Sequence, residues 1–174
     1  MQLDTPERGF SYRFAGPLDL RYDPTLGTTA SDIVNTYSEG ELYEIFSRLG
    51  EENNARAIAR AIVRARGVEK ITTTEKLVKV IGKSQPVLSR IFQALRITVN
   101  DELGALREGL SSAGKLLING GRLVVISFHS LEDRIVKQYM RNSDWRVLTK
   151  KPITASYNEV KANPRSRSAK LRIA

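Results

Sequence analysis

Residues 120–134, GGRLVVISFHSLEDR, are the stretch from which the fold class is predicted. After two glycines, four of the five residues at 123–127 are aliphatic, which favours a strand covered on both faces, as in a parallel α/β sheet. Ser130, with Asp133 three positions later, predicts the N-cap of a following helix. His129 therefore lies at the carboxyl end of a buried strand, where open α/β sheets bind their ligands.

The composition excludes several classes of site. A length of 174 residues suits one compact domain, or one domain with an insertion. The sequence has no cysteine, which excludes disulfides, zinc ribbons and thiol nucleophiles and is typical of a reducing compartment. Its single histidine excludes the usual histidine cluster of a metal site. We predict no metal and no membrane span, because no apolar run is long enough to cross a bilayer.

The positive charge indicates a polyanionic partner. The formal net charge is +9, and the partner of such a chain is most often nucleic acid. From residue 161 to the end there are five basic residues and no acid. Arg165, Arg167 and Lys170 in this segment are candidates for contacts with RNA phosphates. On composition alone, a solvated and frayed terminus is an equal alternative.

Residues 28–86 have the patterns of several short helices. One of these helices carries Arg56, Arg60 and Arg64 one turn apart, opposite its apolar face. The three arginines form a cationic stripe, which is either a solvated surface or a contact for the RNA backbone.

Two further helical signals frame this region. Ser38 and Glu41 have the spacing of a capping box before an amphipathic helix. A single long helix is predicted to begin near Pro86, because an apolar seam with steps of three and four continues to Leu110.

Ser127 and His129 are the candidate pocket residues. Alternate residues of a strand share a face, so the two side chains point the same way if the strand continues to residue 129. No G-x-S-x-G turn is present, which argues against a serine hydrolase, and neither residue has an assigned catalytic role. The neighbouring Glu132 and Asp133 point to different sides of a helix, so we expect them to stabilise its N-terminal dipole.

Eight short segments carry a family resemblance. They are QLD at 2–4, ERGFS at 7–11, GPLDLR at 16–21, ITTT at 71–74, FQALRI at 92–97, NDEL at 100–103, SFHSLEDR at 127–134 and NPRSRSAKLR at 163–172. In this order they resemble the MraW/RsmH methyltransferases. That family uses S-adenosylmethionine to methylate N4 of a cytidine in small-subunit (16S) ribosomal RNA.

The resemblance implies an α/β fold, namely an incomplete Rossmann-like methyltransferase core with an inserted all-helical domain. The expected parts are a loop-rich core segment at 1–27, the helical insertion at 28–86, and the C-terminal part of the core with its basic tail at 87–174. Gln2 matches a glutamine that contacts the cofactor in relatives, and Ser127 and His129 fall in a motif near the pocket. The insertion helps to bind substrate in the family, which would give the arginine stripe a role.

The sequence also departs from the family. Members begin with strands that carry a glycine-rich cofactor loop, an acidic ribose-binding residue and a D-L-G-V-S-S segment before the glutamine, whereas this sequence starts at Met1. We therefore expect a truncated or divided enzyme, similar to the family's C-terminal two-thirds, that binds S-adenosylmethionine very weakly alone. The alternative is a non-catalytic RNA-binding remnant.

The resemblance also implies partners and a compartment. The expected partners are small-subunit ribosomal RNA or the small ribosomal subunit and, for a divided enzyme, a missing N-terminal half. The expected compartment is the bacterial cytoplasm or an organelle.

Overall fold

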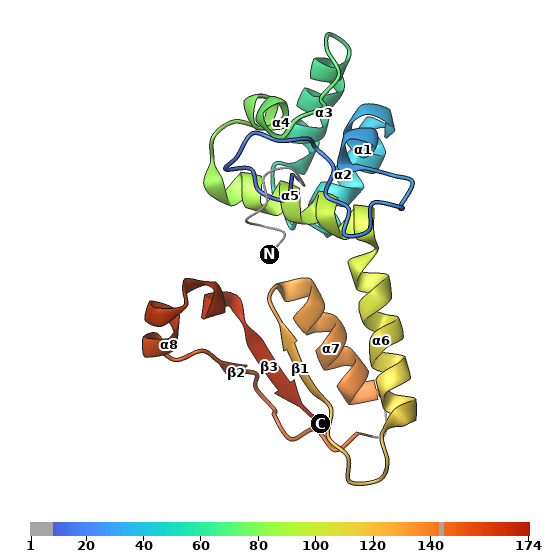
Figure 1. The fold of residues 1–174 in the computed structure, drawn as a ribbon, viewed down its shortest axis with the longest axis vertical. Helices are drawn as coiled ribbons and strands as arrows, with labels where there is room; N and C mark the ends of the chain where they lie inside the picture. The colour runs from blue at the N-terminus through green and yellow to red at the C-terminus, as the bar shows by residue number, and fades with distance from the viewer. Residues whose placement is uncertain (1–8, 143–144) are drawn as a thin grey trace. The chain divides into compact units, whose positions relative to one another are not determined.

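The computed structural model describes residues 9–142 and 145–174, and the chain divides into two compact units, Met1–Glu102 and Leu103–Ala174 (Figure 1). Each unit has its own apolar core. The predicted boundaries after residues 27 and 86 both fall within the first unit. Leu18 and Leu20 share that unit's core with Leu95 of its last helix.

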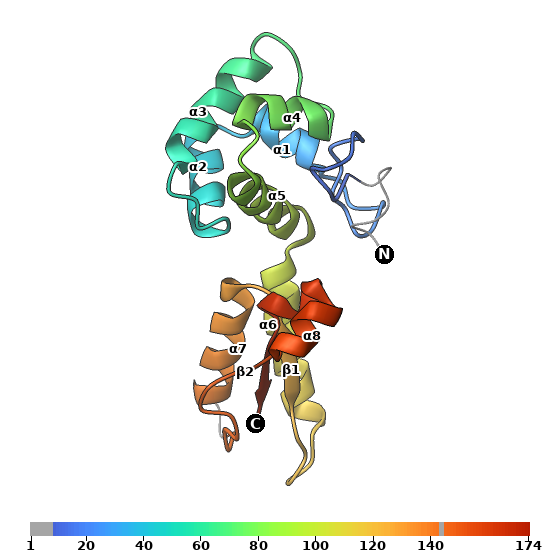
Figure 2. The same cartoon turned by 90° about the vertical axis from the view of Figure 1, so that its left-hand side faces the viewer.

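Helices α1 to α5 build the first unit (Figure 2). They are α1 (Ala30–Thr36), α2 (Glu39–Arg48), α3 (Ala55–Arg66), α4 (Thr74–Ile81) and α5 (Gln85–Asn100). The predicted capping box is confirmed at the start of α2, where the Glu41 N–H donates to the Ser38 hydroxyl and the Glu41 carboxylate accepts from the Ser38 N–H. The apolar helix faces meet in the core, where Phe46, Ile62 and Leu95 are fully buried.

The segment before α1 is irregular, as its glycines and prolines indicate, but it is anchored in the core. Leu18 and Leu20 are buried, and the Leu18 N–H donates to the Thr72 carbonyl at 2.9 Å. Gly9 has φ +67°, and a Cβ there would overlap with the Pro17 carbonyl oxygen. Only glycine therefore fits this turn without displacing the backbone.

The prediction of one long helix from Pro86 to Leu110 is wrong. Helix α5 ends at Asn100, Asp101 follows in the left-handed conformation with φ +43°, and α6 (Glu102–Leu116) begins at once. Aspartate tolerates this conformation better than most residues. The apolar repeat continues past the break, so periodicity alone does not reveal it.

A small sheet and the helices around it build the second unit (Figure 1). After α6 come β1 (Val124–Ser127), α7 (Ser130–Asn142), β2 (Ile153–Thr154), α8 (Tyr157–Ala162), a 3₁₀ helix (Pro164–Ser168) and β3 (Lys170–Ile173). The strand order is β1-β3-β2, and β3 runs antiparallel to both neighbours. Its register pairs Val124 with Ile173 and Ser127 with Lys170. Helix α7 packs against β1 and β3.

The apolar run at 123–127 does contain a strand, but its predicted parallel, two-sided burial is wrong for the described residues. β1 is antiparallel to β3 and lies at the edge of the described sheet. Val125 packs into the core with α7, whereas Val124 and Ile126 are 53% and 55% exposed. Side chains alternate along a strand, so one face of β1 is covered and the other meets solvent.

None of the helices in the described part of the chain has the length and apolar character needed to cross a membrane.

Candidate functional site at the end of strand β1

The turn after β1 places the predicted pocket residues at different depths. β1 ends at Ser127 and α7 begins at Ser130, so His129 lies between them at the carboxyl end of the strand, as predicted. Ser127 is buried, and its hydroxyl donates to the Lys170 carbonyl oxygen at 3.4 Å. That bond holds the Ser127 side chain against β3.

His129 caps helix α7. Its Nδ1 accepts the Glu132 N–H at 3.3 Å, and the Glu132 carboxylate accepts the N–H groups of Phe128 and His129 at 2.8 and 3.3 Å. The predicted cap of Ser130 with Asp133 is wrong by one residue, because the reciprocal pair is His129 with Glu132. Nδ1 acts as the acceptor in this arrangement, and Nε2 lies 3.4 Å from the Glu132 carboxylate. In this conformation Nδ1 is not available as a base.

The two acidic residues of the first turn of α7 have different partners, as predicted for neighbours on a helix. Glu132 closes the cap, whereas the Asp133 carboxylate accepts two bonds from the Arg172 guanidinium of β3, at 2.7 and 3.0 Å. The Lys170 ammonium lies 3.6 Å from the same carboxylate. These contacts, the hydrogen bond from Arg172 above all, hold the pKa of Asp133 below its ordinary value.

A pocket of about 220 Å³ opens beside His129. It is lined by the turn 128–130, by Thr154 of β2 and by the segment 167–170, which leads into β3. The structure thus brings His129 together with two predicted RNA contacts, Arg167 and Lys170. Ser127 and Arg165 do not line this pocket. With two cations and hydroxyl groups at its wall, the pocket suits an anionic or polar ligand.

The basic C-terminal segment is ordered and partly buried, so the frayed alternative is wrong. Residues 170–173 form the central strand of the sheet, and Arg172 is buried at 7% exposure. Ser166 is also buried in the 3₁₀ helix, while Arg165 and Arg167 on either side of it are exposed. The segment therefore presents its arginines from a fixed backbone.

The arginine stripe lies on α3 in the first unit, and its three members have different surroundings. The Arg56 guanidinium lies 4.7 Å from the centre of the Tyr43 ring, and Arg60 lies 3.5 Å from the Glu39 carboxylate. Arg64 is exposed and has no ion pair or hydrogen bond within the described residues. It is the member of the stripe most open to a phosphate.

Gln2, the predicted cofactor contact, lies outside the described residues. Two features of the site were missed from sequence: the contribution of Thr154 and the ion pair between Asp133 and Arg172. The alternation of polar and apolar residues from Lys170 to Ile173 is a strand signal that could have revealed β3. Lys170 and Arg172 then fall on one face.

Comparison with known proteins gives a consistent family match. The model of the MraW methylase family matches residues 1–174. Three curated relatives bear the name ribosomal RNA small subunit methyltransferase H. The protein of Acidobacterium capsulatum is 50% identical over 186 residues, which cover 100% of this chain and 62% of the relative.

The other two relatives show the same partial coverage. The protein of Deinococcus radiodurans is 53% identical over 180 residues, covering 99% of this chain and 57% of the relative. The protein of Nostoc sp. is 50% identical over 182 residues, covering 99% and 59%. The chain therefore spans about three-fifths of the length of these relatives.

Proposed function

Because the chain belongs to the MraW methylase family, we propose that it is the RNA-binding part of an S-adenosylmethionine-dependent methyltransferase that modifies N4 of a cytidine in small-subunit ribosomal RNA. The observation that carries this proposal is the pocket beside His129, with Arg167 and Lys170 at its wall. A cationic pocket at the carboxyl end of a strand suits a nucleotide and its phosphate.

The pocket beside His129 does not fit S-adenosylmethionine by itself. A pocket of about 220 Å³ is smaller than the roughly 300–1,000 Å³ of most small-molecule sites. The strand-to-helix turns at 128–129 and 155–156 contain no glycine, so neither lets the backbone approach a cofactor closely. Apart from Gln2, which stays a proposed contact, we assign cofactor binding to polypeptide equivalent to the part of the relatives that this chain does not cover.

In this proposal the helices at 28–86 are the domain inserted between the parts 1–27 and 87–174 of a Rossmann-like core. They pack with α5 and with the segment before α1 in the first unit, so the second unit, Leu103–Ala174, is the part that we assign to the core in space. The mixed helix and strand order of the second unit supports such a core. The inserted helices present Arg64 to the RNA backbone, while Arg56 and Arg60 also hold α3 to α2. The named relatives are bacterial, so the proposed compartment is the bacterial cytoplasm, where ribosomal subunits are made.

A reconstitution experiment tests this function. Unmodified small ribosomal subunits are incubated with S-adenosylmethionine, the full chain, and the part of the Deinococcus radiodurans relative that this chain does not cover. Nucleoside mass spectrometry then measures N4-methylcytidine. We expect the product only when both polypeptides are present, and less of it with Arg167→Gln and Lys170→Gln.

Two results would contradict parts of the proposal. Product formed by the full chain alone would contradict the assignment of the cofactor site to further polypeptide. Binding of ribosomal RNA without product in the mixture would favour the alternative of a non-catalytic remnant.

A further inference from the structure

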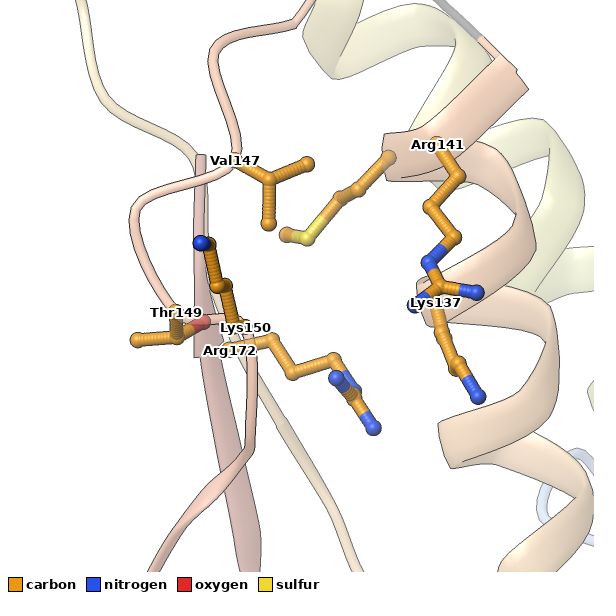
Figure 3. A pocket seen from close by; sticks show the side chains of 7 residues that line it. Lys137, Arg141, Val147, Thr149, Lys150 and Arg172 are labelled. Carbon is orange, nitrogen blue, oxygen red and sulfur yellow. The ribbon is translucent and has the colours of Figure 1, made fainter.

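A second pocket, of about 330 Å³, lies at the C-terminal half of α7 (Figure 3). Lys137 and Arg141 project from α7, and Lys150 and Arg172 belong to the segments on the opposite side of the pocket. Its wall is completed by Met140, Val147 and Thr149, and no acidic residue is among the side chains that line it.

The fold positions the backbone that carries these cations. Lys137 and Arg141 are four residues apart on α7, so they lie on one face of the helix, one turn from each other. Two N–H groups of the segment 148–149 donate to the Ile173 carbonyl at 3.0 and 3.2 Å. They hold the segment beside the end of β3 and so position Lys150. The backbone on both sides of the pocket is therefore held by the fold.

The pocket carries excess positive charge. The Arg172 side chain is 8% exposed and its charge is matched by Asp133 at 2.7 Å. Lys137, Arg141 and Lys150 form no ion pair with any acid of residues 9–142 and 145–174. Three like charges around one pocket repel each other, and a bound anion relieves that repulsion.

We propose that this pocket binds a phosphodiester group of the RNA backbone. The inference rests on the proposed function, and it adds a phosphate site separate from the pocket beside His129. Arginine and lysine donate charge-assisted hydrogen bonds to phosphate oxygens.

The two pockets lie along one helix. No residue lines both of them. The first begins at the N-terminus of α7 and the second includes Arg141, and eleven residues of helical rise separate Ser130 from Arg141 by roughly 16 Å. Asp133 lies between them, since it binds Lys170 of the first pocket and Arg172 of the second. A single RNA strand running along α7 can therefore contact both.

The test measures the salt dependence of RNA binding by the full chain. Fluorescence anisotropy follows a fluorescein-labelled, cytidine-containing single-stranded RNA between about 50 and 200 mM salt. Each lost phosphate contact lowers the slope of log affinity against log salt by about 0.7. For the double variant Lys137→Gln/Arg141→Gln we expect a slope lower by about 0.7, because one phosphate contact is lost, so that over this fourfold range of salt the wild type loses about 2.6-fold more affinity than the variant.

Two further variants separate the pocket from general charge. Lys150→Gln, from the opposite wall, should also lower the slope, by at most about 0.7. Lys83→Gln/Lys161→Gln removes the same net charge as the double variant from exposed lysines that line neither pocket, and it should leave the slope unchanged. Circular dichroism melts verify that each variant is folded.

Each outcome decides the question. Equal slopes for the wild type and Lys137→Gln/Arg141→Gln overturn the pocket proposal and leave RNA binding, hence the proposed function, in place. If the slope falls as much in Lys83→Gln/Lys161→Gln as in Lys137→Gln/Arg141→Gln, the pocket proposal is also overturned, because the change in net charge alone then explains the lower slope. A wild-type chain that binds no RNA overturns both this proposal and the proposed function.

Discussion

Replacing Asp133 with asparagine removes one partner of the ion pair that joins α7 to β3. The Arg172 guanidinium lies 2.7 Å from the Asp133 carboxylate, and the two side chains are only 8% and 12% exposed. Asparagine keeps the shape of aspartate but leaves the Arg172 charge unpaired in the interior. Breaking a buried pair in this way costs about 3–5 kcal/mol, out of the roughly 5–15 kcal/mol that stabilise a typical domain. We expect the free energy of unfolding of the second unit to fall by about that amount.

The assay is urea unfolding followed by the fluorescence of Trp145. Trp145 is the only tryptophan and it packs against the core of the second unit, so it reports on that unit. With an m-value of about 2 kcal/mol per M, the expected loss lowers the midpoint by about 2 M. As a control, the double variant Asp133→Leu/Arg172→Met removes both charges and should be close to the wild type.

Two results would contradict a buried, charge-dependent role for this ion pair. A loss below about 1 kcal/mol for Asp133→Asn would show that the pair behaves as an exposed one. A double variant as unstable as the single one would show that packing, rather than the unpaired charge of Arg172, causes the loss.

The same ion pair makes stability depend on pH. Arg172 holds the pKa of Asp133 below its ordinary value, which is about 3.9 in an unfolded chain. The contribution of the pair is therefore complete above about pH 4 and is lost as the pH falls through the lower, folded-state pKa. Urea titrations below pH 4 should show this loss in the wild type and not in Asp133→Asn.

Three other variants, each with its own comparison, test separate parts of the structure. Gly9→Ala should lower the free energy of unfolding of the first unit by more than about 1 kcal/mol, because Gly9 has φ +67° and no room for a Cβ. Circular dichroism melts would measure this against Gly82→Ala, which has φ +98° but open space. His129→Ala should lower the free energy of unfolding of the second unit by about 1 kcal/mol, because it removes the cap of α7. His129→Asn should keep the cap and the stability, and Trp145 fluorescence during unfolding measures both variants. Val124→Thr with Ile126→Thr should reduce self-association in light scattering, because both side chains are exposed on an edge strand.

Opposite results are equally informative. If Gly9→Ala and Gly82→Ala lower the free energy of unfolding equally, the overlap of a Cβ with the Pro17 carbonyl does not destabilise the protein. Equal stability of His129→Ala and His129→Asn would mean that the cap contributes nothing, and unchanged scattering would show that β1 is not the surface through which the chain associates.

Local signals predicted much of the fold. The capping box of Ser38 and Glu41 and the strand before His129 depend on neighbours within a few residues, and the structure contains both. His129 does follow that strand, and a pocket opens beside it, but its role in binding stays a prediction. Each of these features follows from periodicity or capping chemistry within one segment.

Features that depend on contacts between distant residues could not be predicted from these local signals. An apolar run shows that a strand prefers burial, but it does not show which strands pair with it, so the antiparallel pairing of β1 with β3 was missed. The ion pair of Asp133 and Arg172 joins residues 39 positions apart in the chain. The break at Asp101 lies in a continuous apolar repeat and depends on one residue in the left-handed conformation.

Ultraviolet crosslinking of the full chain to small ribosomal subunits, read by mass spectrometry, tests most directly whether the pocket beside His129 receives the substrate. We predict crosslinks between cytidine-containing oligonucleotides and peptides that include residues 128–130 and 167–170. Crosslinks confined to other surfaces of the chain, with these peptides unmodified, would contradict the account.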